Sequence, residues 1–296
     1  MGNKESTHAS TFSRGQGATS DIRDALTGVP GMQPKNKTGR KVTAQKMKTA
    51  SATGVLALQE HGLKEIPEEL FQLVNVRSLN LATNTLKVLP ASISLLIKLK
   101  TLRLDSNRLE ALPDLSPLSA LTDLSAAGNL LNGVGAVRSL PPSLTKLMLK
   151  DNNLGGVPLA IMEGLPSLQL VDLSGNAIDY VPPLAPVLVA LTELNLDGNA
   201  LRRLGDELLG LPRLKKLSAR DNRIAAVDPT TGEQAISQKL FANSNVDSLE
   251  LSGNILDKSE LVQMAGVEAF LSRRENNKNK NIQGGALVTL SLCGLD

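Results

Sequence analysis

An alternation of apolar and polar residues recurs along the chain with a nearly constant spacing. Each of eight copies reads L-x-L-x-x-N-x-L, as in "LNLATNTL" at residues 79–86, with Val, Ile or Ala at some apolar positions. Two leucines separated by one residue predict a short strand that buries one face. The asparagines of the copies are Asn84, Asn107, Asn129, Asn152, Asn176, Asn199, Asn222 and Asn254. They are 23, 22, 23, 24, 23, 23 and 32 residues apart, so each copy predicts one coil of a stacked repeat.

This pattern and its period are those of the leucine-rich repeat. They predict an α/β solenoid, a leucine-rich repeat horseshoe with a parallel sheet on the concave face and short helical or 3-10 turns on the convex face. Stretches such as "LPASISLLIKL" at residues 89–99 predict the helical turns. The asparagine amides are expected to satisfy backbone groups of the turn and of the neighbouring repeat, forming a buried ladder.

An imperfect earlier copy, "LALQEHGL" at residues 56–63, places His61 at the asparagine position. It predicts a first strand near the N-terminal end, and His61 is interpreted as a cap residue without a catalytic role. The last spacing contains an insertion at residues 228–245, which has two interpretations, a binding element or an enlarged loop. The predicted organisation is a disordered basic tail at 1–50, a leucine-rich repeat domain of about nine repeats at 51–256, a capping helix at 257–275, and at 276–296 a polar linker followed by an extra edge strand or an unpaired tail.

Composition narrows the chemistry that the chain can perform. Hydrophobic residues make up 41% of the 296 residues, but only 2% are aromatic and none is Trp, which fits a core of equivalent aliphatic positions. The single cysteine, Cys293, excludes an intramolecular disulfide and a cysteine-based zinc site. Two histidines and the absence of nucleophile, zinc-protease and phosphate-loop motifs predict no enzyme activity, no cofactor and no metal site. No apolar run reaches the roughly 18 residues that span a bilayer.

Charge is distributed unevenly along the chain. Residues 1–50 contain nine of the 32 Lys/Arg and three of the 29 Asp/Glu, a net of +6, so residues 51–296 hold 23 and 26, a net of −3. The basic residues of one acid-free stretch are Lys35, Lys37, Arg40, Lys41, Lys46 and Lys48. The tail has Phe12 as its only aromatic side chain, so specific nucleic-acid recognition is not expected.

The first residues, "MGNKES", have the spacing of an N-myristoylation signal, with Gly2 as the acylated residue. One myristoyl chain binds membranes only marginally, and a basic segment supplies the second signal. Together they predict a two-part anchor on an anionic membrane surface, and a cytoplasmic, peripheral-membrane location. The competing interpretation is an organelle transit peptide. Eleven Ser/Thr among residues 1–50 are compatible with it, while three acidic residues and only three Arg oppose it.

The outward-facing strand positions predict the binding surface. Met148 and Leu170 fall on adjacent strands and form an apolar spot, with an acidic group and two basic residues beside it. The predicted partner-binding residues are Arg103, Met148, Leu170, Asp172, Glu193, Asn195, Asp197, Lys216 and Arg220. The competing interpretation is an ordinary solvated face of mixed charge. We expect a protein partner on this face of a monomeric chain, because long curved solenoid sheets commonly bind other proteins.

The chain also resembles one particular family. The block "KTASATGVLALQEHGLKEIPEEL" at residues 48–70, the short set of repeats and the ending "LELSGNILDKSELVQMAGVEAFLSRR" are similar to leucine-rich repeat-containing protein fifty-seven and its relatives, which also begin Met-Gly-Asn. The resemblance covers residues 48–275. The chain departs from it in a longer basic linker, the insertion, and the added "GALVTLSLCGLD".

This resemblance implies a non-enzymatic, membrane-associated interaction protein and names no partner. The resulting hypothesis is a scaffold or adaptor held at a cytoplasmic membrane surface. The alternative is a soluble regulatory subunit in phosphatase or small GTPase signalling.

Overall fold

The structure is a computed structural model that describes residues 36–184, 188–281 and 293–295. The chain forms two units, Met1–Arg40 and Lys41–Asp296, and nearly all of the described residues belong to the second. Gly2 and Lys35 lie outside the described residues, as do residues 282–292, which hold most of the expected extra edge strand.

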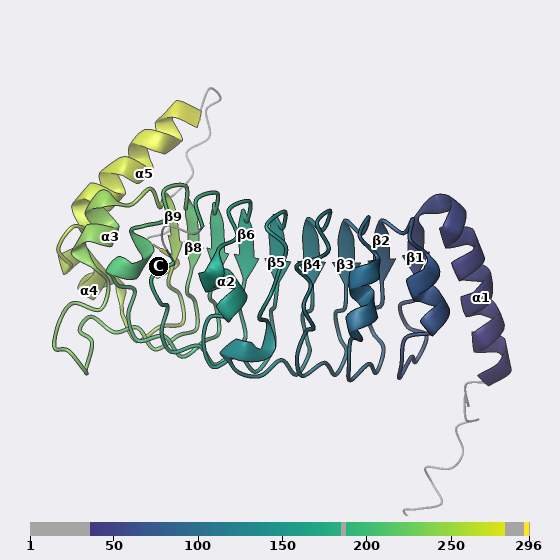
Figure 1. Ribbon diagram of the computed structural model, residues 1–296. Coiled ribbons are helices and arrows are strands. Elements are labelled where there is room, and N and C mark those ends of the chain that lie inside the picture. The colour runs from purple at the N-terminus through teal and green to yellow at the C-terminus, as the bar shows by residue number, and fades with distance from the viewer. Residues whose placement is uncertain (1–35, 185–187, 282–292, 296) are drawn as a thin grey trace, which may run out of the picture. The chain divides into compact units, whose positions relative to one another are not determined.

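A single parallel sheet runs through the second unit, with its nine strands side by side in chain order (Figure 1). The strands are β1 Val55–Ala57, β2 Ser78–Asn80, β3 Thr101–Arg103, β4 Asp123–Ser125, β5 Lys146–Met148, β6 Leu170–Asp172, β7 Glu193–Asn195, β8 Lys216–Ser218 and β9 Ser248–Glu250. The central residue of each strand pairs with that of the next, as Leu56 does with Leu79 and Leu217 with Leu249. The predicted leucine-rich repeat solenoid is therefore confirmed.

The core is one continuous stack of aliphatic side chains. The central residue of every strand is at most 3% exposed, and Leu81 and Leu86 show that the other apolar positions of the motif are equally buried. Burying one leucine contributes about 1.5–3 kcal/mol, and a three-residue strand alone has no surface to bury it against. Each coil is therefore stable only because its neighbours cover it.

Short helical turns complete several of the coils. They are η2 Glu68–Gln72, η3 Ala91–Leu95, η4 Val134–Ala136, α2 Leu159–Glu163 and η5 Asp206–Leu208. Three of them begin directly after Pro67, Pro90 and Pro158. Proline has a fixed φ and no N–H to leave unpaired, so it suits the start of such a turn.

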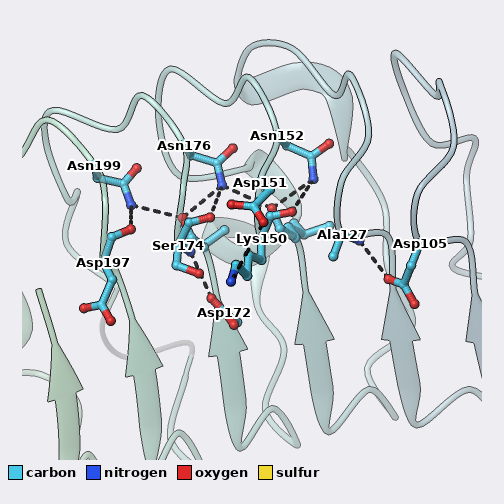
Figure 2. Close-up of polar contacts among 12 residues, drawn as sticks. Asp105, Ala127, Lys150, Asp151, Asn152, Asp172, Ser174, Asn176, Asp197 and Asn199 are labelled. Carbon is cyan, nitrogen blue, oxygen red and sulfur yellow. Dashed lines mark hydrogen bonds and ion pairs between the residues drawn. The ribbon is translucent and has the colours of Figure 1, made fainter. Parts of the chain in front are cut away.

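The asparagine side chains connect consecutive coils. Asn107 donates from Nδ2 to the carbonyls of Leu81 (3.0 Å) and Leu104 (2.9 Å), and its Oδ1 accepts from the N–H of Leu86 (3.1 Å). The other seven asparagines likewise bond to both their own coil and the preceding one, as Figure 2 shows in part for Asn152, Asn176 and Asn199. In the first coil His61 is half-buried, and its Nδ1 lies 2.5 Å from the Gln59 carbonyl.

The residue before each of these asparagines has a positive φ. It is glycine in four coils, for example Gly198 with φ +62°, and a side chain bears the same conformation in the others, for example Thr83 with φ +55°. The chain reverses direction here to leave the strand, and glycine does so without the Cβ clash that other residues meet. The sequence pattern therefore includes a backbone requirement beside the asparagine.

Helix α1 (Asn36–Thr53) corrects the prediction that residues 1–50 are disordered throughout. Thr43, Met47 and Ala50 recur at helical spacing, and Ala50 is completely buried in the core. The Gly54 N–H donates to the Ala50 carbonyl (2.8 Å). Gly54 has φ +74°, and the helix ends before it. The density of lysines concealed this stripe of buried and partly buried side chains, which covers the first coil of the solenoid.

The C-terminal cap also differs from the prediction of one helix at 257–275. Two helices stand there, α4 (Lys258–Gln263) and α5 (Val267–Asn281), separated by Gly266 at φ +92°. A Cβ on Gly266 would lie 2.6 Å from the Gln238 carbonyl oxygen, so close packing against the insertion requires glycine here. The positive φ of this glycine interrupts the helical conformation between α4 and α5.

The insertion forms part of this cap. Its helix α3 (Gln238–Asn243) buries Phe241, whose ring centroid lies 5.8 Å from that of Phe270 on α5. Beyond the last coil, the Leu251 N–H donates to the Cys293 carbonyl (2.8 Å), and Cys293 is completely buried. The insertion is thus a structural element whose apolar face closes the end of the core.

Candidate functional site: the concave groove

The strand register places outward-facing residues in two rows. Asp172 on β6 lies between Met148 on β5 and Asn195 on β7, while Leu170 lies between Lys146 and Glu193. The alternation within each strand buries the central residue and leaves its two neighbours on the opposite surface. Residues about 23 positions apart in sequence, as the asparagine spacing sets them, therefore become neighbours on this surface.

A shallow groove of about 410 Å³ crosses β5 to β9 on this surface. Eight of the nine predicted partner-binding residues line it; Arg103 is exposed on β3 and does not. The groove also includes Ser218, Ser248 and Glu250, which the prediction left out. Their motif positions could have identified them, because β9 pairs with β8 in the same register in spite of the insertion.

Both basic side chains of the groove have acidic partners. Lys216 Nζ lies 2.6 Å from Glu193 Oε1, and Arg220 lies 3.2 Å from Glu250 Oε2. These pairs are partly exposed and contribute little to stability, about 0–1 kcal/mol each. They nevertheless neutralise the two cations that the groove contains.

Asp197 has a structural role that the sequence analysis missed. Its Oδ1 accepts from the Ser218 hydroxyl (2.5 Å) and from the Arg220 N–H (2.8 Å) of the next coil. Asp105 does the same four coils earlier with the Ala127 N–H (2.9 Å; Figure 2). An aspartate after the second leucine therefore connects two coils and is less available to a partner.

Asp172 has a different environment. Its side chain is only 8% exposed, and its Oδ1 accepts from the Ser174 N–H (2.9 Å; Figure 2). The hydroxyl of Ser174 is buried and has no hydrogen-bond partner in the described part of the chain. Met148 and Leu170, both partly buried, lie beside this carboxylate.

A larger hollow of about 1100 Å³ lies elsewhere, between η2, η3 and the loops after β1 and β2. It is lined by exposed apolar residues such as Val88 and Leu95 and by charges of both signs. We consider the concave groove the better candidate, because a nearly buried carboxylate lies in its floor beside apolar side chains.

Among the described residues, no three His, Cys, Asp or Glu side chains come together in a way that would hold a metal ion. The same residues include no helix with the length and apolarity to cross a membrane.

Known proteins share the repeat. Human leucine-rich repeat-containing protein 58 is 32% identical over 117 residues, which are 40% of this chain and 24% of that protein. Mouse podocan is 30% identical over 214 residues, covering 70% of this chain and 34% of its own length. The structure of an internalin, InlF from Listeria monocytogenes, superposes with a TM-score of 0.56 at 21% identity over 73% of this chain and 58% of that one.

The chain is a leucine-rich repeat protein. It spans about a quarter to a third of the length of these two curated relatives. No family model matches it, and the narrower resemblance to leucine-rich repeat-containing protein fifty-seven is not confirmed by the comparisons. Leucine-rich repeat proteins generally act in protein–protein interaction and are typically not enzymes.

The basic residues are distributed over α1 and the segment before it. Lys46 donates from Nζ to the Ala57 carbonyl (2.9 Å), so its ammonium group is held against the first coil, whereas Lys48 is exposed. Lys37, Arg40 and Lys41 fall within the backbone of α1. The described part of the basic segment is therefore helical, and Lys46 is less available to contact a membrane than the sequence indicated.

Proposed function

We propose that this leucine-rich repeat protein is a non-enzymatic scaffold that binds one partner protein in its concave groove. The observation that supports this most directly is the gathering of Met148, Leu170 and Asp172 on adjacent strands within the groove. Apolar side chains near the centre of a surface, surrounded by polar groups, are typical of the residues that contribute most to protein binding. A groove of about 410 Å³ accommodates a few side chains, so the partner presents a projecting segment.

Proximity labelling in cells tests this proposal with three full-length chains. They are the wild type, Leu170→Glu in the groove, and Leu95→Glu in the larger hollow beside η3. We expect Leu170→Glu to lose a set of labelled proteins that Leu95→Glu retains, because a buried charge cannot pack against an apolar anchor. The reverse result would place the binding surface beside η3, and identical labelling by all three chains would exclude both surfaces.

We further propose that the scaffold works as a monomer at the cytoplasmic face of a membrane, anchored by myristoylated Gly2 and by the basic residues before and within α1. A basic residue near an anionic surface contributes about 1 kcal/mol, which would make a single myristoyl chain an effective anchor. Metabolic labelling with an alkyne fatty acid tests this in the wild type and in Gly2→Ala. Absence of label on the wild type would rule out the anchor.

The alternative is a soluble regulatory subunit in phosphatase or small GTPase signalling. It predicts that Gly2→Ala changes neither the location nor the labelled partners of the chain. The lipid-anchored scaffold predicts that both change, so fractionation and proximity labelling of this one variant separate the two functions.

A further inference from the structure

We propose that the partner carries a cationic side chain directly beside an apolar one, and that both enter the concave groove at β6. The cation pairs with Asp172, and the apolar side chain packs on Met148 and Leu170. This inference rests on the proposed function, because it specifies the partner chemistry of the same groove.

The fold does not require a negative charge at position 172. Asn80 on β2 and Asn195 on β7 occupy the same strand position, and each accepts a hydrogen bond from the N–H two residues later, at 3.0 Å. Asp172 makes this bond to Ser174 at 2.9 Å. A neutral amide therefore satisfies the turn equally well, and the carboxylate of Asp172 adds a charge that the turn does not use.

That charge lies in the floor of the groove. Asp172 is only 8% exposed, and of its two oxygens only Oδ1 accepts a hydrogen bond from the residues that the structure describes. Removing a carboxylate from water is costly unless it is paired. A partner that covers the groove removes water from Asp172, so it must supply a cation to pair with the carboxylate, which makes Asp172 a recognition residue.

No basic side chain of the chain itself fills this role within the described ranges. Lys216 pairs with Glu193 and Arg220 with Glu250, while Lys150 of the preceding coil pairs with Asp151 at 3.8 Å (Figure 2). A cation that pairs with Asp172 would therefore come from outside the described chain.

The apolar half of the recognition comes from the two neighbouring residues. Met148 is the register partner of Asp172 on β5, and Leu170 precedes Asp172 by two residues on β6, so both flank the carboxylate. An apolar side chain placed against them excludes water from the ion pair and strengthens it. This arrangement fits a residue pair such as Arg-Leu or Lys-Phe in an exposed segment of a protein.

Groove charge points to the same partner. Four acidic and two basic side chains line the groove, an excess of two negative charges. Outside the basic tail, residues 51–296 carry a net charge of −3. Phosphate-rich ligands are repelled by such a surface, whereas a basic peptide is attracted to it.

A displayed library of random short peptides, selected on the full-length chain, tests the inference. We expect the wild type to enrich Lys or Arg next to Leu, Ile, Phe or Met. Asp172→Asn should lose the basic preference and keep the apolar one, and Leu170→Ser should lose the apolar preference. Asp179→Asn, an exposed residue of the same coil outside the groove, removes the same charge and should select the same peptides as the wild type.

The most enriched peptide then permits a double-mutant cycle. Replacing its cation by an uncharged residue, or Asp172 by Asn, should each weaken binding about tenfold to a hundredfold, and the two changes together should weaken it no further than either alone. Circular dichroism of Asp172→Asn should match that of the wild type, because Asn accepts the Ser174 N–H.

Other results overturn the inference and also report on the proposed function. Peptides that depend on Leu170 but show no cationic preference would refute the role of Asp172 and leave the groove as the binding site. Peptides whose binding is unchanged by every groove variant would refute both. Retention of no peptide by the wild type would refute the inference, while the cellular labelling experiment decides the proposed function independently.

Discussion

Removing one amide of the asparagine ladder should destabilise the solenoid far more than its size suggests. Asn152 donates from Nδ2 to the carbonyls of Ala126 (3.0 Å) and Leu149 (3.0 Å), and its Oδ1 accepts from the N–H of Leu131 (3.1 Å). Asn152→Ala leaves a buried N–H and two carbonyls without these partners. An unsatisfied buried group costs about 1–3 kcal/mol, so we expect a loss of about 3 kcal/mol, with the N–H contributing most.

Urea unfolding followed by circular dichroism measures this loss, and the neighbouring Asn153 provides a matched control. Asn153 is exposed, and Asn153→Ala should change the free energy of unfolding by less than about 0.5 kcal/mol. Hydrogen exchange should locate the effect, because the amide of Leu131 loses its acceptor and should exchange faster than amides several coils away. Equal stability of the two variants, or unchanged exchange at Leu131, would show that the ladder does not connect the coils as argued.

Three further changes test the backbone and the caps. Gly198→Ala should cost about 1 kcal/mol of stability, because φ is +62° while no atom comes closer than 3.5 Å to the new Cβ. Chemical denaturation measures this cost, and an unchanged free energy of unfolding would show that strain at this turn is unimportant. Phe270→Ala removes a buried ring that contacts Phe241 and should cost about 3–5 kcal/mol; limited proteolysis should then cleave first near α3 and α5, and cleavage elsewhere would contradict their role as the cap. Asp257 caps α4, and the hydrogen bond from the Glu260 N–H lowers the pKa of its carboxyl. Its stabilisation is therefore present above the unfolded pKa of about 3.9 and lost as pH falls through the lower folded value; Asp257→Asn should lessen this acid-dependent loss in a pH series of unfolding midpoints, and an unaltered pH dependence would contradict it.

The repeat illustrates which contacts a sequence encodes locally. The Leu-x-Leu alternation and the asparagine after it were sufficient to predict nine parallel strands in chain order, because each coil buries the same apolar positions against its neighbours. The rows on the concave surface followed from the same spacing, which is why eight predicted binding residues share one groove.

The ends of the solenoid were predicted less well. Thr43, Met47 and Ala50 form a stripe of buried and partly buried side chains in a segment rich in lysine. This stripe is buried only because the helix packs on the end of the first coil. Gly266 interrupts the C-terminal helix because the Gln238 carbonyl approaches it closely. This contact joins the insertion to the C-terminal helices, which are distant from it in the sequence.

The sequence by itself determined the repeat, its register and the identity of the outward-facing residues, since these depend on periodicity and on contacts between adjacent coils. Only the tertiary structure decided which of the outward residues are already in use. Asp197 and Asp172 are equivalent acidic candidates in the sequence, yet one connects two coils through Ser218 and Arg220, and the other keeps a carboxylate oxygen without a partner within the described chain. The reason is physical: hydrogen-bond satisfaction and burial depend on side chains of neighbouring coils, and a linear pattern does not record which donors reach which acceptors.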